Sequence, residues 1–247
     1  METWTSTTKT ILAAALGTLG VPIRLEKMLD ERSGKGRRDF FLGPASTDGK
    51  YQTGSLKSAF EKGTLLREQT DHPITDIVYA KHSRDRILDA VNRGVRIQLV
   101  TQSGSRKTRT FYQHGGATSF PGTEGLKELF STRDLNLVGA LSRFGVPVLQ
   151  VTGPAGKREF FLDARARLTS GEEMAAVVKK WREGEISSEH PFAFAMWGLI
   201  NYGRLLREMN EETEQVLIRK PGSAKAAYVN PGTTGKGMDK VRSFFLG

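Results

Sequence analysis

Two stretches decide the fold: ALGTLGVPI at residues 15–23 and ALSRFGVPV at residues 140–148. Each predicts a helix that ends at a glycine, Gly20 or Gly145, because glycine readily takes the left-handed conformation that closes a helix. The proline two residues later, Pro22 or Pro147, cannot continue the helix. These two prolines are 125 residues apart, and their matching surroundings indicate an internal repeat.

Four more blocks recur in the same order along the chain. Their offset falls from 120 to 112 residues, which indicates that the second copy has shorter loops. We therefore predict a tandem duplication, with module 1 at residues 1–131 and module 2 at residues 132–247. The paired blocks are GKGRRDFFL at 34–42 with GKREFFL at 156–162, DHP at 71–73 with EHP at 189–191, GSRK at 104–107 with GSAK at 222–225, and GLKEL at 125–129 with GMDKV at 237–241.

Hydrophobic spacing in each module predicts the element order α-β-β-α-α-β-β-α. Leu12, Leu16 and Leu19, for example, recur at the spacing of an amphipathic helix. Ser83 and Asn201 occupy matching positions, where either side chain is able to cap a further helix after a break. The expected fold class is α+β, with antiparallel hairpins packed on helices and a pseudo-twofold relation between the modules. The predicted hairpins join 21–27 to 38–42, 96–101 to 109–113, 146–151 to 158–162, and 215–219 to 226–229.

Part of module 2 resembles a small domain family of unknown function from bacteria and their viruses. The resemblance rests on RDLNLVGAL at 133–141, GVP at 145–147 and WREG at 181–184. That family pairs a Thr-Asp-Leu helix opening with a Gly-Phe/Ile-Pro turn, a hairpin and a Trp-x-x-Gly helix end. The likeness covers roughly the first two-thirds of module 2 and extends more faintly to module 1, where Lys9 replaces the aspartate. It implies a fold and a phage or mobile-element origin, and it transfers no active site.

Composition narrows the classes of partner and location. The formal charge of +10, from 37 Lys and Arg against 27 Asp and Glu, favours a polyanionic partner. The absence of cysteine excludes disulfides and thiol nucleophiles, and it favours an intracellular protein. The apolar segment at 11–17 looks like a signal peptide, but its near-copy at 135–141 assigns it to the fold instead. We expect no membrane span and a cytoplasmic location, or a virion if the chain is structural.

No catalytic or metal-binding signature emerges. His72 and His190 each lie between an acidic residue and a proline, where they are more plausible as helix-start residues than as acid–base catalysts. His82 and His114 have no counterparts in module 2 and no metal-ligand spacing. The glycine-rich segments lack the pattern of a phosphate-binding loop. We expect a protein that is not an enzyme and has no cofactor.

Basic residues at the hairpin turns give the functional hypothesis. The charge recurs at the turns of both modules while the sequence there drifts, and a β-ribbon with a cationic tip is able to straddle phosphates. We therefore predict a non-catalytic nucleic-acid-binding protein, with the kind of nucleic acid left open. The candidate contact residues are Lys35, Arg37, Arg38, Arg93, Arg96, Arg106, Lys107, Arg109, Lys157, Arg158, Arg219, Lys220 and Lys225.

Two alternatives remain open on the sequence. The first is a structural or assembly protein of the virion type, whose repeated modules make protein–protein or self-association contacts. The second is a DNA binder of the winged-helix kind, in which Lys81, Arg84 and Arg86 on the helix before a hairpin matter as much as the turns.

Overall fold

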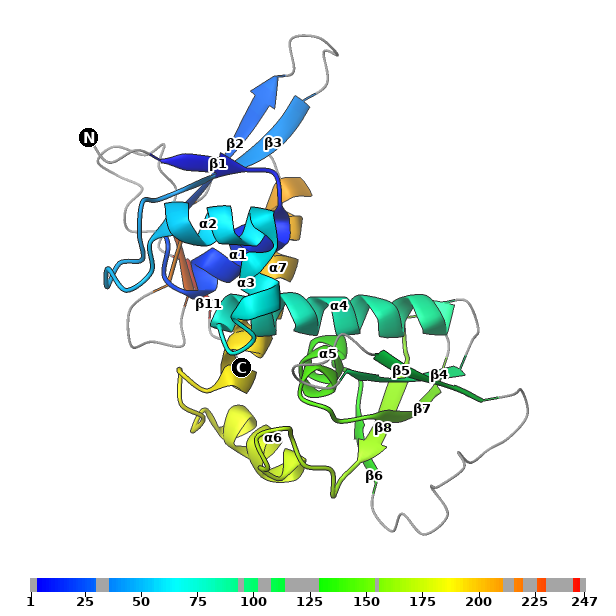
Figure 1. The fold of residues 1–247 in the computed structure, drawn as a ribbon. Helices are drawn as coiled ribbons and strands as arrows, with labels where there is room; N and C mark the ends of the chain where they lie inside the picture. The colour runs from blue at the N-terminus through cyan, green and yellow to red at the C-terminus, as the bar shows by residue number, and fades with distance from the viewer. Residues whose placement is uncertain are drawn as a thin grey trace. The chain divides into compact units, whose positions relative to one another are not determined.

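The structure is a computed structural model with an α+β fold (Figure 1). The chain consists of two compact units. The first contains Met1–Thr75 and Trp197–Gly247, and the second contains Asp76–Met196. The residues that the structure describes are 4–29, 36–92, 96–101, 108–113, 129–153, 156–210, 216–219, 226–229 and 242–244. Within these, side chains are not described at 26–29, 36–38, 96–101, 108–113, 208, 210, 216–219, 226–229 and 242–244.

The first unit packs helices against an antiparallel sheet. Its strands follow the order β1-β3-β2-β9-β10-β11, so strands from the two ends of the chain meet where β2 pairs with β9. The elements are β1 (Thr5–Thr7), α1 (Thr10–Thr18), β2 (Ile23–Leu29), β3 (Gly36–Leu42), α2 (Thr53–Lys62), α3 (Thr64–Glu68), most of α7 (Pro191–Asn210), β9 (Val216–Arg219), β10 (Ala226–Val229) and β11 (Arg242–Phe244).

The second unit has a three-stranded antiparallel sheet of order β6-β8-β7 and a separate hairpin of β4 and β5. Strand β4 lies next to β7. The elements are most of α4 (Pro73–Asn92), β4 (Arg96–Thr101), β5 (Thr108–Gln113), β6 (Leu129–Thr132), α5 (Leu135–Arg143), β7 (Val148–Thr152), β8 (Glu159–Asp163), α6 (Met174–Glu183) and the first turns of α7.

Each core contains buried side chains from a short helix and from a sheet strand. In the first unit, Leu12 and Leu16 of α1 are fully buried, as is Phe40 of β3. In the second unit, Leu141 of α5 and Leu162 of β8 are fully buried in the same way. Alternate residues of a strand point to opposite faces, so one face of each central strand is committed to the core.

Several local geometries occur at the positions that the sequence repeat pairs. Gly20 and Gly145 have φ angles of 86° and 88°. The backbone N–H of Lys9 donates to Thr7 Oγ1 at 3.1 Å, and that of Asp134 donates to Thr132 Oγ1 at 3.1 Å. Strand register also corresponds, with Ser6 opposite Phe41 and Ser131 opposite Phe161. Helices α4 and α7 both run for 20 residues from a proline to an asparagine.

The structure confirms the four predicted hairpins and corrects three other expectations. A short strand, β1 or β6, precedes the first helix of each predicted module, and its three or four residues are too few to show a periodicity. Helices α4 and α7 are continuous, and Ser83 and Asn201 are buried within them rather than capping new helices. Of the predicted closing helices, Leu129 belongs to β6 and the rest lies outside the described residues.

Candidate nucleic-acid interface

The turn between β7 and β8 carries the two predicted site residues whose side chains the structure describes. Lys157 is exposed and Arg158 is half-buried. Gly153 and Gly156 hold this turn, with φ angles of 86° and 81°, where residues with a Cβ are disfavoured. A Cβ on Gly153 would lie 2.6 Å from the carbonyl oxygen of Lys157. The backbone around Lys157 and Arg158 is therefore set by a turn that needs glycine.

Arg158 links this turn to the end of α4. Its Nη1 donates a hydrogen bond to Oδ1 of Asn92 at 2.8 Å, and Asn92 is the last residue of α4. Arg96 begins β4 four residues later, so its Cα lies within about 14 Å of the Cα of Asn92. We call Asn92, Arg96, Lys157 and Arg158 the β7–β8 turn cluster. It combines residues of the β7–β8 turn with the first residue of β4, a strand that contacts β7, and the sequence assigns these residues to hairpins of different predicted modules.

Predicted residues in the first unit lie at two ends of one sheet. Arg37 pairs with Met28, near the end of β2 that leads to its turn. Arg219 is at the other end, because β9 pairs antiparallel to β2 with Leu217 opposite Ile23. The separation is roughly 23 Å along the strands at about 3.3 Å per residue. The backbone positions of Arg37 and Arg219 therefore lie at opposite ends of this sheet.

The remaining predicted site residues are placed only in part. The backbone positions of Arg38 and Arg109 are described, opposite Lys27 and Val100 respectively. The others lie outside the described residues; they are Lys35, Arg93, Arg106, Lys107, Lys220 and Lys225.

Basic side chains on α4 are engaged within the second unit. Arg84 Nη1 donates to Oδ1 of Asn136 on α5 at 3.2 Å, and its side chain is 18% exposed. Lys81 forms an ion pair with Asp85 one turn further along the same helix. Arg86 is exposed. Lys81 and Arg84, which a winged-helix interpretation requires as DNA contacts, therefore bond other protein groups.

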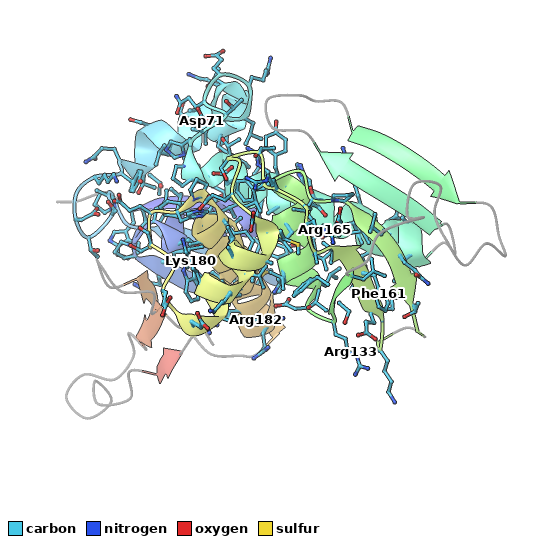
Figure 2. All side chains as sticks on the ribbon, turned by 90° about the horizontal axis from the view of Figure 1, so that it is seen from below. Asp71, Arg133, Phe161, Arg165, Lys180 and Arg182 are labelled. Atoms are coloured by element: carbon cyan, nitrogen blue, oxygen red, sulfur yellow. The ribbon has the colours of Figure 1, made fainter. Side chains whose placement is uncertain are left out.

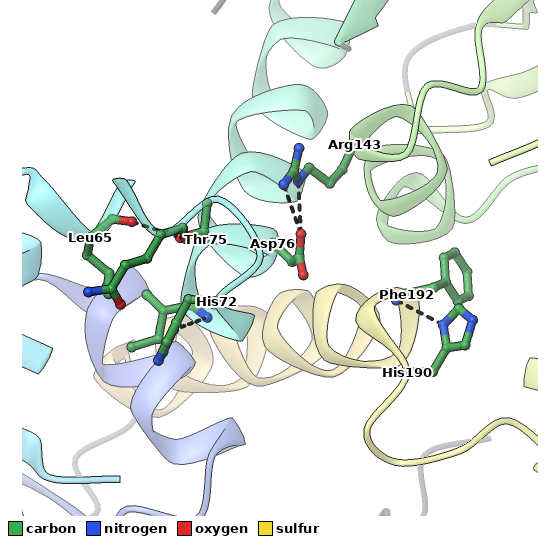
Figure 3. Close-up of polar contacts among 9 residues, drawn as sticks. Leu65, His72, Thr75, Asp76, Arg143, His190 and Phe192 are labelled. Atoms are coloured by element: carbon green, nitrogen blue, oxygen red, sulfur yellow. Dashed lines mark hydrogen bonds and ion pairs between the residues drawn. The ribbon is translucent and has the colours of Figure 1, made fainter. Parts of the chain in front are cut away.

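His72 and His190 are confirmed as helix-start residues (Figure 3). The Nδ1 atom of His72 accepts the backbone N–H of Ile74 at 3.2 Å, and that of His190 accepts the N–H of Phe192 at 3.1 Å. Both bonds satisfy an amide of the first turn, which has no partner inside the helix. Burial lowers the pKa of His72 below its ordinary value, so the neutral ring is the form that accepts.

The opposite side of the His190 ring holds Glu172. The distance from Nε2 to Glu172 Oε2 is 2.9 Å, and Ser170 Oγ donates to the same carboxylate oxygen at 2.9 Å. The hydrogen bond from His190 lowers the pKa of Glu172. The histidine is thus flanked by a helix amide and a carboxylate, and the serine bonds the carboxylate rather than the ring. A serine nucleophile needs its histidine base within hydrogen-bond reach. Ser170 bonds Glu172 instead of His190, so the two residues do not form such a pair.

Among the described residues, no three histidine, cysteine, aspartate or glutamate side chains gather closely enough to hold a metal ion. Within the same part of the chain, no helix combines the length and the apolar character needed to cross a membrane.

The contacts of charged residues that sequence reasoning missed include Arg158 with Asn92 and Arg143 with Asp76. Arg143 Nε and Nη2 lie 3.1 and 2.9 Å from Asp76 Oδ1, and both side chains are nearly fully buried. A signal for this pair was present, because Arg143 takes the place of Thr18 in the repeated helix. A charge at a position otherwise committed to the core requires a buried partner.

Comparison of the chain with models of protein families, with curated proteins and with solved structures finds no match. The resemblance of module 2 to a bacterial and viral domain family therefore stays a prediction from the sequence.

Proposed function

We propose that the protein binds nucleic acid without catalysis and that the β7–β8 turn cluster is a principal contact site. The observation that carries the proposal is the hydrogen bond from Arg158 to Asn92. It joins the turn that bears Lys157 and Arg158 to Asn92, the last residue of α4.

The chemistry of the cluster suits phosphate. A guanidinium carries five N–H donors, of which the contact with Asn92 uses Nη1. Lys157 adds a mobile ammonium at the exposed turn, and the exposed Asn92 adds neutral donors. Contacts of this kind fix a protein on a nucleic-acid backbone without reading the sequence. We therefore propose binding that depends steeply on salt and little on base sequence.

The basic ends of the first unit act separately in this proposal. Because Arg37 and Arg219 lie at opposite ends of one sheet, a single phosphate cannot engage both. We propose that they contribute to affinity through the total charge. The contacts expected from Arg106, Lys107 and Lys220 stay predictions from the sequence.

The proposal is tested by removing the cluster. In a variant with Arg96→Ala, Lys157→Ala and Arg158→Ala, affinity for short duplex and single-stranded DNA and RNA should fall at 50 mM salt. The slope of log affinity against log salt should drop by about 0.9 for each lost duplex phosphate contact. Electrophoretic shifts at several salt concentrations measure both quantities.

A matched control removes the same charge elsewhere in the second unit. Arg133, Arg165 and Lys180 are exposed and belong to other parts of this unit (Figure 2). Their replacement by alanine should leave the salt slope nearly unchanged. Equal losses in the two triple variants would show that binding follows net charge alone, and the assignment to the cluster would then be wrong.

The winged-helix alternative is less well supported. Its reading helix would present Lys81 and Arg84, yet Arg84 bonds Asn136 and Lys81 bonds Asp85. Placing either side chain on a base edge would break one of these contacts.

Exposed apolar residues favour an assembly role as the second candidate. Among the described residues, the large hydrophobic side chains that are exposed are Trp4, Leu129 and Leu206. Trp4 directly precedes β1 and Leu129 begins β6, so two of the three adjoin strands at the edge of a sheet, where pairing with another chain is possible. Light scattering without nucleic acid tests this candidate, because a large regular assembly would favour it.

We also propose that the two modules arose by duplication. The proposal is supported by the sequence blocks and by paired features such as the two 20-residue helices and the two histidine caps. The boundary at residues 131 and 132 is part of the same proposal.

A further inference from the structure

Each compact unit draws on both sequence modules. The first unit joins residues before Thr75 to residues after Trp197, and the second unit spans Asp76–Met196. The proposed module boundary at 131 and 132 therefore falls inside the second unit. The changes of unit fall inside α4 and α7. We call the N-terminal part of each module its front half and the C-terminal part its rear half. The front half of each module thus packs with the rear half of the other module, and we call this the exchanged arrangement.

In the first unit, front elements of module 1 contact rear elements of module 2. Strand β2 pairs with β9. Asn201 Nδ2 of α7 donates to Thr18 Oγ1 of α1 at 2.9 Å in the core, and Thr18 Oγ1 donates on to the carbonyl of Ala14. At the other end of α1, Thr10 Oγ1 lies 3.6 Å from Met209 Sδ.

In the second unit, the front of module 2 contacts the rear of module 1. Arg143 at the end of α5 forms the buried ion pair with Asp76 in the first turn of α4 (Figure 3). The guanidinium also lies 5.0 Å from the centre of the Tyr79 ring. Gly139 of α5 allows close approach, since a Cβ there would be 3.0 Å from the carbonyl oxygen of Ala80.

The polar residues at these two helix contacts are different. The sequence repeat pairs Thr18 with Arg143, and Asp76 with Phe194. If α1 packed on α4 of its own module, Asp76 would face Thr18 in place of an arginine. If α5 packed on α7, Arg143 would face Phe194. Either change leaves a buried charge without its counter-ion, which is strongly unfavourable.

We infer that the buried Asp76–Arg143 pair determines which helix each module half accepts, and so directs the chain into the exchanged arrangement. The inference rests on the proposed duplication, because only related halves compete for the same partners. Such a role for a buried polar pair corresponds to the way single polar core residues fix register and partner in helical assemblies. The ion pair is well placed for it, with a carboxylate at a helix N-terminus and a cation at a helix C-terminus.

Crosslinking of engineered cysteines in the full chain tests the arrangement, because the natural chain has no cysteine. A short bis-maleimide should join Thr10→Cys to Met209→Cys within one chain. The matched control is Thr10→Cys with Val91→Cys, since Val91 is the repeat counterpart of Met209. It should give no crosslink. A crosslink in the control, or a crosslinked dimer in the first pair, would overturn the exchanged arrangement within one chain.

The role of the ion pair is tested by adding Asp76→Leu and Arg143→Met to both cysteine variants. Apolar replacement of a buried pair often preserves folding, and circular dichroism checks this. We expect the Thr10–Val91 crosslink to rise from undetectable to a measurable fraction, whereas Arg143→Lys should keep the original pattern. A folded double variant that still gives only the Thr10–Met209 crosslink would overturn the inference.

If the double variant does not fold, Thr18→Arg provides the second test. It gives α1 a cation that competes with Arg143 for Asp76, so the Thr10–Val91 crosslink should appear. Its absence would overturn the inference. None of these measurements involves nucleic acid, so the proposed function can fail while the inference holds, and the reverse.

Discussion

At the scale of single residues, Gly139 offers the sharpest prediction about packing. An added Cβ would lie 2.7 Å from Arg84 Cβ and 3.0 Å from the Ala80 carbonyl oxygen, and overpacking of this kind costs about 1–3 kcal/mol. The gain in helix propensity from Gly to Ala is about 1 kcal/mol. Gly139→Ala should therefore lower the free energy of unfolding, measured with urea, by about 1 kcal/mol.

Gly203 supplies the control, because it is also a helical glycine but has nothing within 4 Å of an added Cβ. Gly203→Ala should keep the gain in propensity and raise stability by up to about 1 kcal/mol. Equal effects of the two substitutions would contradict the close approach of α5 to α4.

A second residue-scale prediction concerns pH. Burial lowers the pKa of His72 in the folded chain, so as pH falls through about 6.5 the unfolded chain binds a proton first. The contribution of His72 to the free energy of unfolding is therefore fully present above about pH 6.5 and is lost as the pH falls below this value. Protonation also removes the Nδ1 lone pair that accepts the N–H of Ile74. In His72→Asn, which keeps a capping oxygen, urea unfolding at pH 7.5 and 5.5 should differ less than in the natural chain.

At the scale of elements, α5 and α1 differ in how they begin. The Asp134 carboxylate accepts the backbone N–H groups of Asn136 and Leu137 at 2.8 and 3.2 Å. Its counterpart Lys9 makes no side-chain cap. Asp134→Ala should cost about 1 kcal/mol of unfolding free energy. Lys9→Asp should raise the free energy of unfolding by adding a cap to α1. This gain should be smaller than a full cap provides, because the contact between Lys9 and the Phe60 ring is lost. Urea unfolding of both variants checks these two predictions. An Asp134→Ala variant with unchanged stability would contradict the capping role of Asp134.

The sequence could predict the hairpins but not the shortest strands. Hairpins followed from alternating hydrophobic residues bounded by glycine-containing turns, and every predicted strand end lies within two residues of the observed one. Strands β1 and β6 could not be predicted, because a strand of three or four residues depends on its partner, β3 or β8. The break expected at Ser83 and Asn201 is wrong because tertiary contacts bury both residues within long helices. Local capping preference is weak beside such packing.

The candidate site was less accessible to sequence reasoning than the fold. The basic residues of the β7–β8 turn could be identified from composition and turn position. The contact of Arg158 with Asn92 could not, because the two residues belong to different predicted modules and nothing local connects them. The same holds for Asp76 and Arg143, whose meeting depends on how α4 packs on α5.

At the scale of the whole molecule, the units and the sequence modules differ in a way that truncation should reveal. A chain of residues 1–131 keeps α1 and β2 but lacks their partners α7 and β9. It also keeps Asp76 without Arg143, so the ion pair between α4 and α5 cannot form. We expect this fragment to be unstable as a monomer. Sedimentation and circular dichroism would measure this, and a stable folded monomer would contradict the arrangement.

The division of the chain into units also has a consequence for the order of folding during synthesis. The second unit is one continuous segment, Asp76–Met196, whereas the first needs both ends of the chain. A ribosome releases the chain from its N-terminus at about 5–20 residues per second. Once Met196 has emerged, the second unit has all its residues, whereas the first unit still lacks its last strands. Until the C-terminal segment emerges, β2 has its partner β3 but lacks β9, and α1 lacks its contact with Asn201 of α7. Slow translation after Met196 would lengthen the interval in which these apolar residues are open to chaperones or aggregation.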